Sequence, residues 1–320
     1  MKKVSLFILI SVQIIYSQVE YDPTLIRGAT ACANCHPAAV AQWEGTAHFK
    51  VFSGSESEPA MHRRPETKKI LKKLGMKSAK RGVCVDCHFT TQHLAGKKRP
   101  RAISGPSCES CHGASGNWIE IHGVYGNDAS GGKATMETEI ASHKVDRLKN
   151  ADDNGMIRTS NVYEIAKNCY KCHTVPNEEL VNVGGHNAGS EINFSEWLNN
   201  DIKHNFLYSN GTENRGAPRD FDIPKRQNKN KVIGLLVDLE YGLRGYAKAS
   251  SDGAYSSAMQ TRIETAIGNL KNYDSAGVHS TYISDAIAIT QGIKISIGSV
   301  NSLNETADGV KKIAQNLSLN

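Results

Sequence analysis

Residues 231–320 carry a regular pattern of apolar positions, separated by alternating steps of three and four residues. This spacing places the apolar side chains on one face of an α-helix. The pattern is interrupted near Gly253, Gly277 and Gly298, so it predicts four helices of similar length, packed as an antiparallel bundle. The residues expected in the core of this bundle are Val232, Leu236, Leu239, Leu243, Tyr246, Tyr255, Met259, Ile263, Ile267, Leu270, Ile283, Ile287, Val300, Leu303, Val310, Ile313 and Leu317.

Residues 18–210 show a different pattern. Short apolar-spaced segments alternate with polar and glycine-containing stretches, and few segments have the period of two that is typical of strands. This pattern favours a mainly α domain of short helices and loops. Residues 211–230 are rich in turn-forming residues and predict a linker between this domain and the bundle.

Residues 1–17 have the pattern of a secretory signal peptide. Two lysines precede a short apolar run at residues 6–15, and Ser17 provides a small residue for cleavage. A retained N-terminal anchor is the alternative, although the apolar run is shorter than a membrane-spanning helix requires. We expect a cleaved signal peptide and a protein located in the periplasm of a bacterium.

The composition excludes a disordered chain and a polytopic membrane protein. Of the 320 residues, 39% are hydrophobic and 22% are charged. The chain has eight cysteines, and all of them fall into four Cys-x-x-Cys-His motifs, so none is left for a disulfide framework. The cysteines of the motifs are Cys32, Cys35, Cys84, Cys87, Cys108, Cys111, Cys169 and Cys172.

The Cys-x-x-Cys-His motif is typical of c-type haem attachment. The two thiols form bonds with the haem vinyl groups, and the histidine that follows binds the iron from one side. A zinc site is the alternative, but a zinc ribbon pairs Cys-x-x-Cys units and needs no histidine after each one. We therefore expect four covalently bound haem c groups, whose proximal iron ligands are His36, His88, His112 and His173.

Eight further histidines could fill the second axial position of the haem irons. Each of the three tryptophans of the chain stands a few residues before one of them, and these three histidines are His48, His122 and His204. A flat indole beside an imidazole suits packing against a porphyrin. We expect these three histidines to be distal ligands, although core helices with incidental histidines would give the same pattern.

Four irons and three such histidines leave one haem without an assigned partner. The weaker candidates are His62, His93, His143 and His186, because His93 lies close to its own motif and the other three lie in polar or glycine-containing loops. Two possibilities stay open. Either one of these histidines completes the fourth haem, or one haem keeps an open distal position.

The formal net charge of +6 does not indicate nucleic-acid binding. The signal peptide contains two of the lysines, and the propionates of four haems would add about eight negative charges. Thirteen basic residues and only two acidic residues lie between residues 61 and 101, around the second motif. This basic segment predicts a docking surface for an acidic redox partner. An equally weighted alternative is that its lysines balance haem propionates or keep this face in water.

Three segments resemble the tetrahaem cytochrome c-554 family: CANCHPAAVAQWEGTAH, GPSCESCHGASGNWIEIH and NCYKCHTVPNEELVN. The similarity covers about residues 22–219, and the four motifs occur in the same order. It implies that three haems have two histidine ligands and that the haem of the second motif lacks a distal protein ligand. It also implies that His48 serves the fourth haem, His122 the third and His204 the first. The C-terminal bundle departs from the family and leaves the partner open.

These features predict a periplasmic tetrahaem cytochrome that transfers electrons between redox partners. Ligation by two histidines lacks the thioether of histidine–methionine cytochromes, so we expect low-potential carriers. The alternative is an enzyme that reduces nitric oxide or a related nitrogen oxide at an open haem of the second motif. A redox sensor is a third possibility. The bundle could serve homo-oligomerisation or partner docking.

Overall fold

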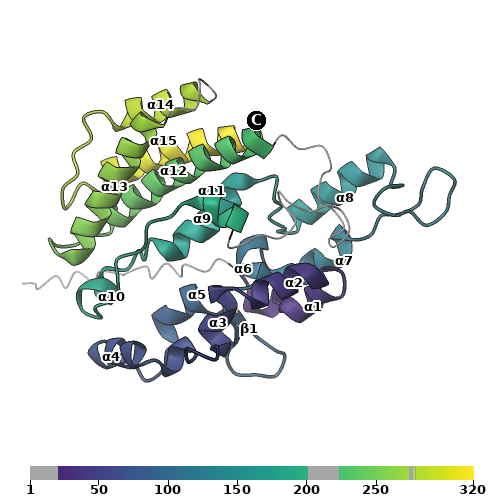
Figure 1. The fold of residues 1–320 in the computed structure, drawn as a ribbon, viewed down its shortest axis with the longest axis horizontal. Helices are drawn as coiled ribbons and strands as arrows, with labels where there is room; N and C mark the ends of the chain where they lie inside the picture. Colours follow the sequence, from purple (N-terminus) through teal and green to yellow (C-terminus); the bar gives the residue numbers. More distant parts are fainter. Residues whose placement is uncertain (1–20, 201–222, 274–276, 278) are drawn as a thin grey trace, which may run out of the picture.

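The computed structural model describes residues 21–200, 223–273, 277 and 279–320, and within these residues the chain is mainly helical (Figure 1). This confirms the mainly α fold expected from the sequence. The predicted signal peptide and the candidate ligand His204 lie outside the described residues. The predicted domain boundaries stay predictions, although helix begins at Ile223, inside the predicted linker.

The region that carries the four motifs consists of short elements. Its α-helices are α1 (Ala29–Ala33), α2 (Pro37–Glu44), α3 (Ala47–Ser53), α4 (Pro65–Lys73), α5 (Val85–His88), α6 (Cys108–His112), α7 (Ile119–His122), α8 (Ala141–Asp153), α9 (Val162–His173), α10 (Glu178–Asn182) and α11 (Phe194–Asn200). Single 3-10 turns occur at η1 (Pro23–Leu25), η2 (Met61–Arg63), η3 (Gly82–Cys84) and η4 (Ser115–Asn117).

Helices near the motifs begin at residues that favour a helix start. Pro37 is the first residue of α2, where its missing N–H removes no hydrogen bond of the helix. Ser107 and Ser110 form a capping box at the start of α6, and the side chain of Asn161 accepts a hydrogen bond from the first turn of α9. Local sequence therefore fixes where the motif-bearing helices begin.

One small hairpin connects the second motif to the third. Strands β1 (Thr90–Gln92) and β2 (Arg101–Ser104) pair antiparallel, with Thr90 opposite Ser104. The buried hydroxyl of Thr90 donates to the carbonyl of Gly105 at 2.9 Å. The hairpin thereby fixes the backbone just before the third motif.

The C-terminal region consists of α12 (Ile223–Ala247), α13 (Ala254–Asn272), α14 (Ser280–Thr290) and α15 (Val300–Leu319). Helix α12 packs against both α13 and α15, and α14 packs against α15 (Figure 1). Tyr255 donates a hydrogen bond to Gly245, and Arg262 pairs with Asp238, so residue numbers fall along α12 as they rise along α13. The first two helices of the bundle are therefore antiparallel, as expected.

Thirteen of the seventeen residues expected in the bundle core are buried, whereas Ile267, Ile287 and Ile313 are half-buried. Val300 is 43% exposed at the start of α15, and α14 has 11 residues whereas α12 has 25. The buried face of α15 includes Ala307 and Ala314, both 0% exposed. Alanine is too small to stand out in an apolar pattern, yet it lets two helices approach closely.

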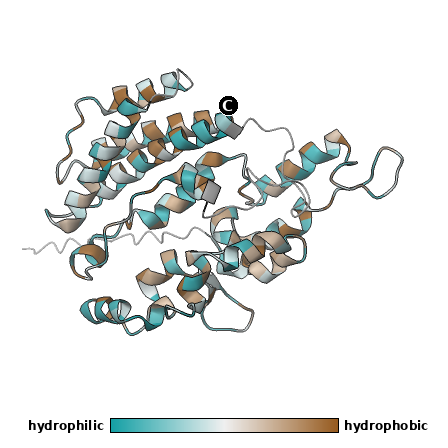
Figure 2. Ribbon diagram, in the orientation of Figure 1, coloured by the Kyte–Doolittle hydropathy of each residue, from teal (hydrophilic) through white to brown (hydrophobic). Residues whose placement is uncertain are grey.

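The hydrophobic core of the bundle continues into the motif region. One cluster of buried residues includes Tyr163 and Tyr170 of α9 together with residues of all four bundle helices. The hydroxyl of Tyr163 donates to the carboxylate of Glu240 on α12 at 2.9 Å. Figure 2 shows apolar and hydrophilic positions side by side on the bundle helices. No described helix is long and apolar enough to cross a membrane.

Candidate haem-binding sites

Each Cys-x-x-Cys-His motif lies on or beside one helical turn. The first motif includes the end of α1, the second covers the last residue of η3 and α5, the third is α6, and the fourth ends α9. A spacing of three residues on such a turn places both thiols on one side of the backbone. All eight cysteines are free, so every thiol is available to a haem vinyl group.

Thiols of different motifs contact each other. Cys32 of the first motif lies beside Cys108 of the third, and Cys87 of the second lies beside Cys172 of the fourth. The side chain of Asn168 on α9 donates to the backbone of the third motif at 3.0 Å. The motifs therefore lie in the spatial order first, third, fourth and second, which differs from their order in the sequence.

Three pairs of histidines face each other at nearly equal distances. The distances between ring centres are 6.3 Å for His36 and His122, 6.0 Å for His48 and His173, and 6.1 Å for His88 and His186. Each pair joins one motif histidine to one histidine outside the motifs. A metal–imidazole bond of about 2 Å on each side would place two ring centres roughly 6.2 Å apart. The spacing fits one haem iron between the two rings of each pair.

Several of these rings are oriented by hydrogen bonds at Nδ1. The Nδ1 of His122 lies 2.8 Å from the carbonyl oxygen of Ile119, and that of His112 lies 2.9 Å from the carbonyl oxygen of Ile157. A proton donated from Nδ1 to a carbonyl leaves Nε2 with its lone pair for a metal. Burial lowers the pKa of His88 and of His173 to about 4, which keeps both rings neutral, as iron ligation requires.

The structure brings together some of the expected ligands and rearranges others. His48 lies opposite His173, as the family resemblance implies. His122 lies opposite His36 of the first motif, whereas the resemblance assigns it to the third haem. His186, which we treated as a weak candidate in a loop, faces His88. His122 thus lies in the place opposite His36 that the resemblance assigns to His204, which is outside the described residues.

Two tryptophans lie beside the facing histidines. The ring of Trp118 stands edge-on to His122 at 5.1 Å, and that of Trp197 stands edge-on to His173 at 4.8 Å. Trp43 instead donates from Nε1 to the carbonyl of Pro106 at 2.8 Å. Within the described chain the buried Nε1 of Trp118 has no hydrogen-bond partner. Such a donor fits an acceptor from outside the chain, such as a haem propionate.

His48 is held in place by a close approach of two backbones. A Cβ atom at Gly105 would lie 1.8 Å from the carbonyl oxygen of His48, so no other residue fits there without moving α3. The turn fixed by Thr90 therefore also sets the position of this histidine.

His122 is held by an ion pair. The guanidinium of Arg147 donates to the carbonyl of His122 and pairs with the buried carboxylate of Glu139. Hydrogen bonds from Arg147 hold the pKa of Glu139 down at about 2. The carboxylate thus stays ionised, and Arg147 stays fixed, at ordinary pH.

The bundle contacts the fourth motif through Ser190. Arg262 on α13 pairs with Asp238 on α12 and donates to the carbonyl of Ser190. The backbone N–H of Ser190 donates to the carbonyl of His173 at 3.0 Å, and its Oγ lies 3.4 Å from Nδ1 of the same histidine. Charged side chains of the bundle are thereby tied to a proximal histidine.

In the described ranges, no group of three or more histidine, cysteine, aspartate or glutamate side chains is placed to hold a metal ion directly. A haem iron takes four ligands from its porphyrin, so a pair of histidines is sufficient for it. The paired histidines and free thiols fit haem c.

Helical Cys-x-x-Cys-His motifs, three of which have a histidine that faces a second imidazole, are the mark of a c-type cytochrome, a protein that transfers electrons through covalently bound haem c. Residues 31–113 match the family model of cytochrome c554 and c-prime. The matched residues contain the first three motifs, whereas the fourth lies beyond them. No curated protein and no solved structure matches the chain.

Proposed function

We propose that the protein is a periplasmic tetrahaem cytochrome that carries electrons between redox partners. The observation that carries this proposal is the repeated spacing of 6.0 to 6.3 Å between a motif histidine and a second histidine. Two histidines on each of several irons favour rapid electron transfer over ligand chemistry, because both axial positions are filled.

The contacts between thiols support a continuous path for electrons. Bound haem iron supplies reversible one-electron chemistry. The chain's own residues set the order, because Cys32 adjoins Cys108 and Cys87 adjoins Cys172, while α6 packs on α9. Haems attached to cysteines that lie side by side would have their porphyrin edges close together. The first and second motifs then lie at opposite ends of the path.

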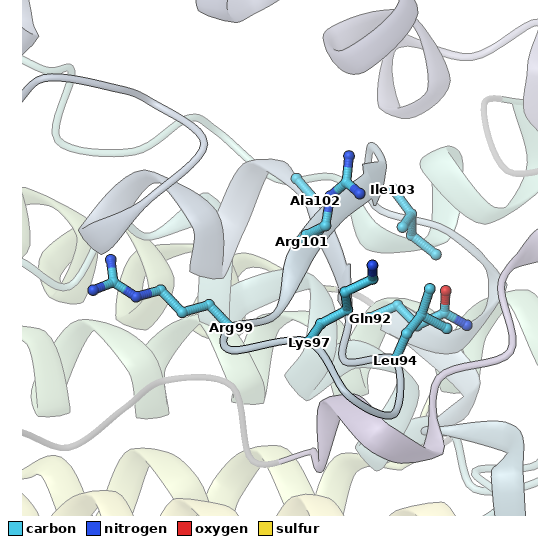
Figure 3. Close-up of a pocket in the computed structure, with 7 residues that line it drawn as sticks. All are labelled: Gln92, Leu94, Lys97, Arg99, Arg101, Ala102 and Ile103. Carbon is cyan, nitrogen blue, oxygen red and sulfur yellow. The ribbon is translucent and has the colours of Figure 1, made fainter.

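The second motif, at one end of the proposed electron path, is surrounded by the basic segment at residues 61–101. Helix α4 of this segment is mostly hydrophilic (Figure 2): Leu71 is buried, whereas Lys68, Lys69, Lys72 and Lys73 are exposed. Further basic residues line a surface hollow of about 100 Å³ beside the hairpin, where Lys97 approaches Gln92 and Leu94 (Figure 3). Complementary charge accelerates encounter, so we propose that an acidic redox protein docks on this basic segment.

The signal peptide supports export to the periplasm, where c-type haem is attached. The bundle is proposed to serve docking or homo-oligomerisation. The alternative function, reduction of nitric oxide or a related nitrogen oxide, needs an open distal position at His88. His186 lies where that opening would be.

The haem count tests the cofactor assignment. Protein matured with a c-type haem attachment system should have the mass of the chain after signal-peptide cleavage plus four haems, and a reductive titration should take up four electrons per chain. A variant with Cys169→Ser and Cys172→Ser should lose one haem and one electron. A mass with fewer than four haems in the unaltered protein would refute the tetrahaem proposal.

The docking proposal is tested with an acidic flavodoxin as electron donor. Replacing Lys69, Lys72 and Lys73 by Glu should lower the second-order rate of haem reduction at low salt by about tenfold or more. The matched control replaces the exposed Lys271, Lys294 and Lys312 of the bundle region by Glu, which changes the net charge equally. Equal losses in both variants would show that net charge alone, and not this surface, attracts the partner.

A further inference from the structure

The loop after α10 places a histidine opposite the second motif. The ring centre of His186 lies 6.1 Å from that of His88, within 0.2 Å of the other two facing pairs. The two residues are far apart in the sequence, so this proximity is created by the fold. The ring planes are inclined by 52°, compared with 57° for His48 and His173.

The backbone of this loop is held at three successive residues. The N–H groups of Gly184, Gly185 and His186 donate to carbonyls of α10 at 3.0, 3.1 and 3.1 Å. Gly185 has a φ of 75°, the left-handed conformation that ends many helices and that glycine adopts without strain. The direction in which His186 leaves α10 is therefore set by a regular helix end.

The bundle anchors α10 from one side. The carboxylate of Glu178 accepts hydrogen bonds from the backbone and hydroxyl of Ser250 at 2.8 and 2.7 Å, and from the hydroxyl of Ser251 at 3.1 Å. The side chain of Asn182 accepts from the backbone N–H of Tyr255 at 2.9 Å. Both ends of α10 are thereby fixed to the connection between α12 and α13.

Helix α4 packs against the loop from the other side. A Cβ atom at Gly185 would lie 2.7 Å from Nζ of Lys73, and one at Gly184 would lie 3.3 Å from Cδ1 of Leu74. Nδ1 of His186 lies 2.7 Å from the carbonyl oxygen of Asn187. With its proton on Nδ1, the ring presents Nε2 as a free ligand atom, as in His122.

The other spare histidines of the described chain have different surroundings. The Nε2 of His93 bonds to the carbonyl of Lys97 at 2.7 Å, and His143 pairs with Glu139. The ring of His62 packs against Phe52 at 6.4 Å. Of these candidates, His186 is the one whose ring faces a motif histidine.

We infer that His186 is the distal iron ligand of the haem attached at Cys84 and Cys87. This inference rests on the proposed haem attachment and adds a ligand that the family resemblance places at no haem. Its consequence is that the second haem has both axial positions filled. The site would then conduct electrons next to the basic segment and exclude nitric oxide and carbon monoxide.

The test compares the full holoprotein with three variants by electron paramagnetic resonance and by carbon monoxide binding to the reduced form. His186→Ala should convert one haem from low to high spin, and that haem should bind carbon monoxide. His186→Met should keep this haem low-spin but raise its reduction potential, because a thioether favours the ferrous state. The matched control His62→Ala should leave all spectra unchanged.

Two outcomes would overturn the inference. One is an unaltered protein with a high-spin haem that binds carbon monoxide and stays the same in His186→Ala. The other is a high-spin signal of His186→Ala that persists after Cys84→Ser and Cys87→Ser remove the second haem. Haem mass separates this result from failure of the proposed function: four attached haems with no effect of His186→Ala refute the ligand alone, whereas too few haems refute the tetrahaem proposal.

Discussion

The motif region and the bundle bury their apolar side chains to different extents. In the bundle, Leu236, Leu239 and Leu243 are 0% exposed and pack against apolar side chains of the neighbouring helices. Among the largest fully buried side chains of the described chain, Ile26 is the one that lies before residue 160. The motif region contains instead histidine pairs held about 6 Å apart.

This difference indicates what each region needs in order to fold. The core of the bundle consists of protein side chains, its own and those of α9, so burial of apolar surface stabilises it directly. The motif region instead holds facing imidazoles about 6 Å apart, and a haem held between them would add apolar surface to its core. The haem is therefore part of the core of one region and is absent from the core of the other.

Removing the haems should have the largest effect. A chain with all eight cysteines replaced by serine should lose amide protection by about a hundredfold or more in α1 to α8 while α12, α13 and α15 keep theirs. Hydrogen exchange resolved by mass spectrometry measures both regions in one sample. If the motif helices kept their protection without haem, the cofactor would not be part of their core.

A cavity in the bundle should have the next largest effect. Leu236→Ala should lower the free energy of unfolding of the bundle by about 3 kcal/mol, because it removes a fully buried side chain. Denaturant unfolding followed by far-ultraviolet circular dichroism measures this loss. Leu319→Ala is the control, since Leu319 is 80% exposed and should change stability by less than about 0.5 kcal/mol. The number of attached haems should be the same in both variants.

Gly105→Ala should affect the motif region and spare the bundle. The added methyl group would overlap the carbonyl of His48, so α3 must move at a cost of about 2 kcal/mol. His48 should then separate from His173 and leave one haem partly high-spin in electron paramagnetic resonance. Gly268→Ala on α13 is the control, because nothing lies within 4 Å of its added Cβ. An unchanged spin state would show that α3 adjusts without moving its histidine.

The smallest effect is expected where the two regions meet. Arg262→Ala removes a positive charge tied to His173 through Ser190, and a nearby cation favours the ferrous state. One haem should therefore lose reduction potential, by on the order of tens of millivolts. A potentiometric titration measures this shift. Arg244→Ala, which breaks pairs with Glu240 and Asp308 inside the bundle, should leave all potentials unchanged.

The helices of the bundle could be predicted from the sequence because the pattern that predicts them is local. A repeat of three and four residues predicts a buried face whatever the rest of the chain does. It failed at Val300, which is 43% exposed on the first turn of α15, and at Ala307 and Ala314, whose small side chains resemble surface positions.

The motif histidines could also be predicted from the sequence, because their spacing from the two cysteines of each motif defines them. Their partners were harder to predict, since facing rings are long-range contacts. The association with tryptophan pointed to His122. The family resemblance assigns His122 to the third haem, whereas the structure places it opposite His36 of the first motif. His186 had a local signal that we did not use: two glycines follow a short helix and direct the next residue.

The position of α9 has a consequence for the order of events during biogenesis. The helix ends in the fourth motif, and its opposite face, with Tyr163 and Tyr170 each 1% exposed, is covered by the bundle. A chain is made from its N-terminus, so α12 and α15 become available last. Cys169 and Cys172 can be reached by an attachment enzyme most easily before those helices dock. If the fourth motif carries a haem, docking of the bundle would therefore hinder its attachment.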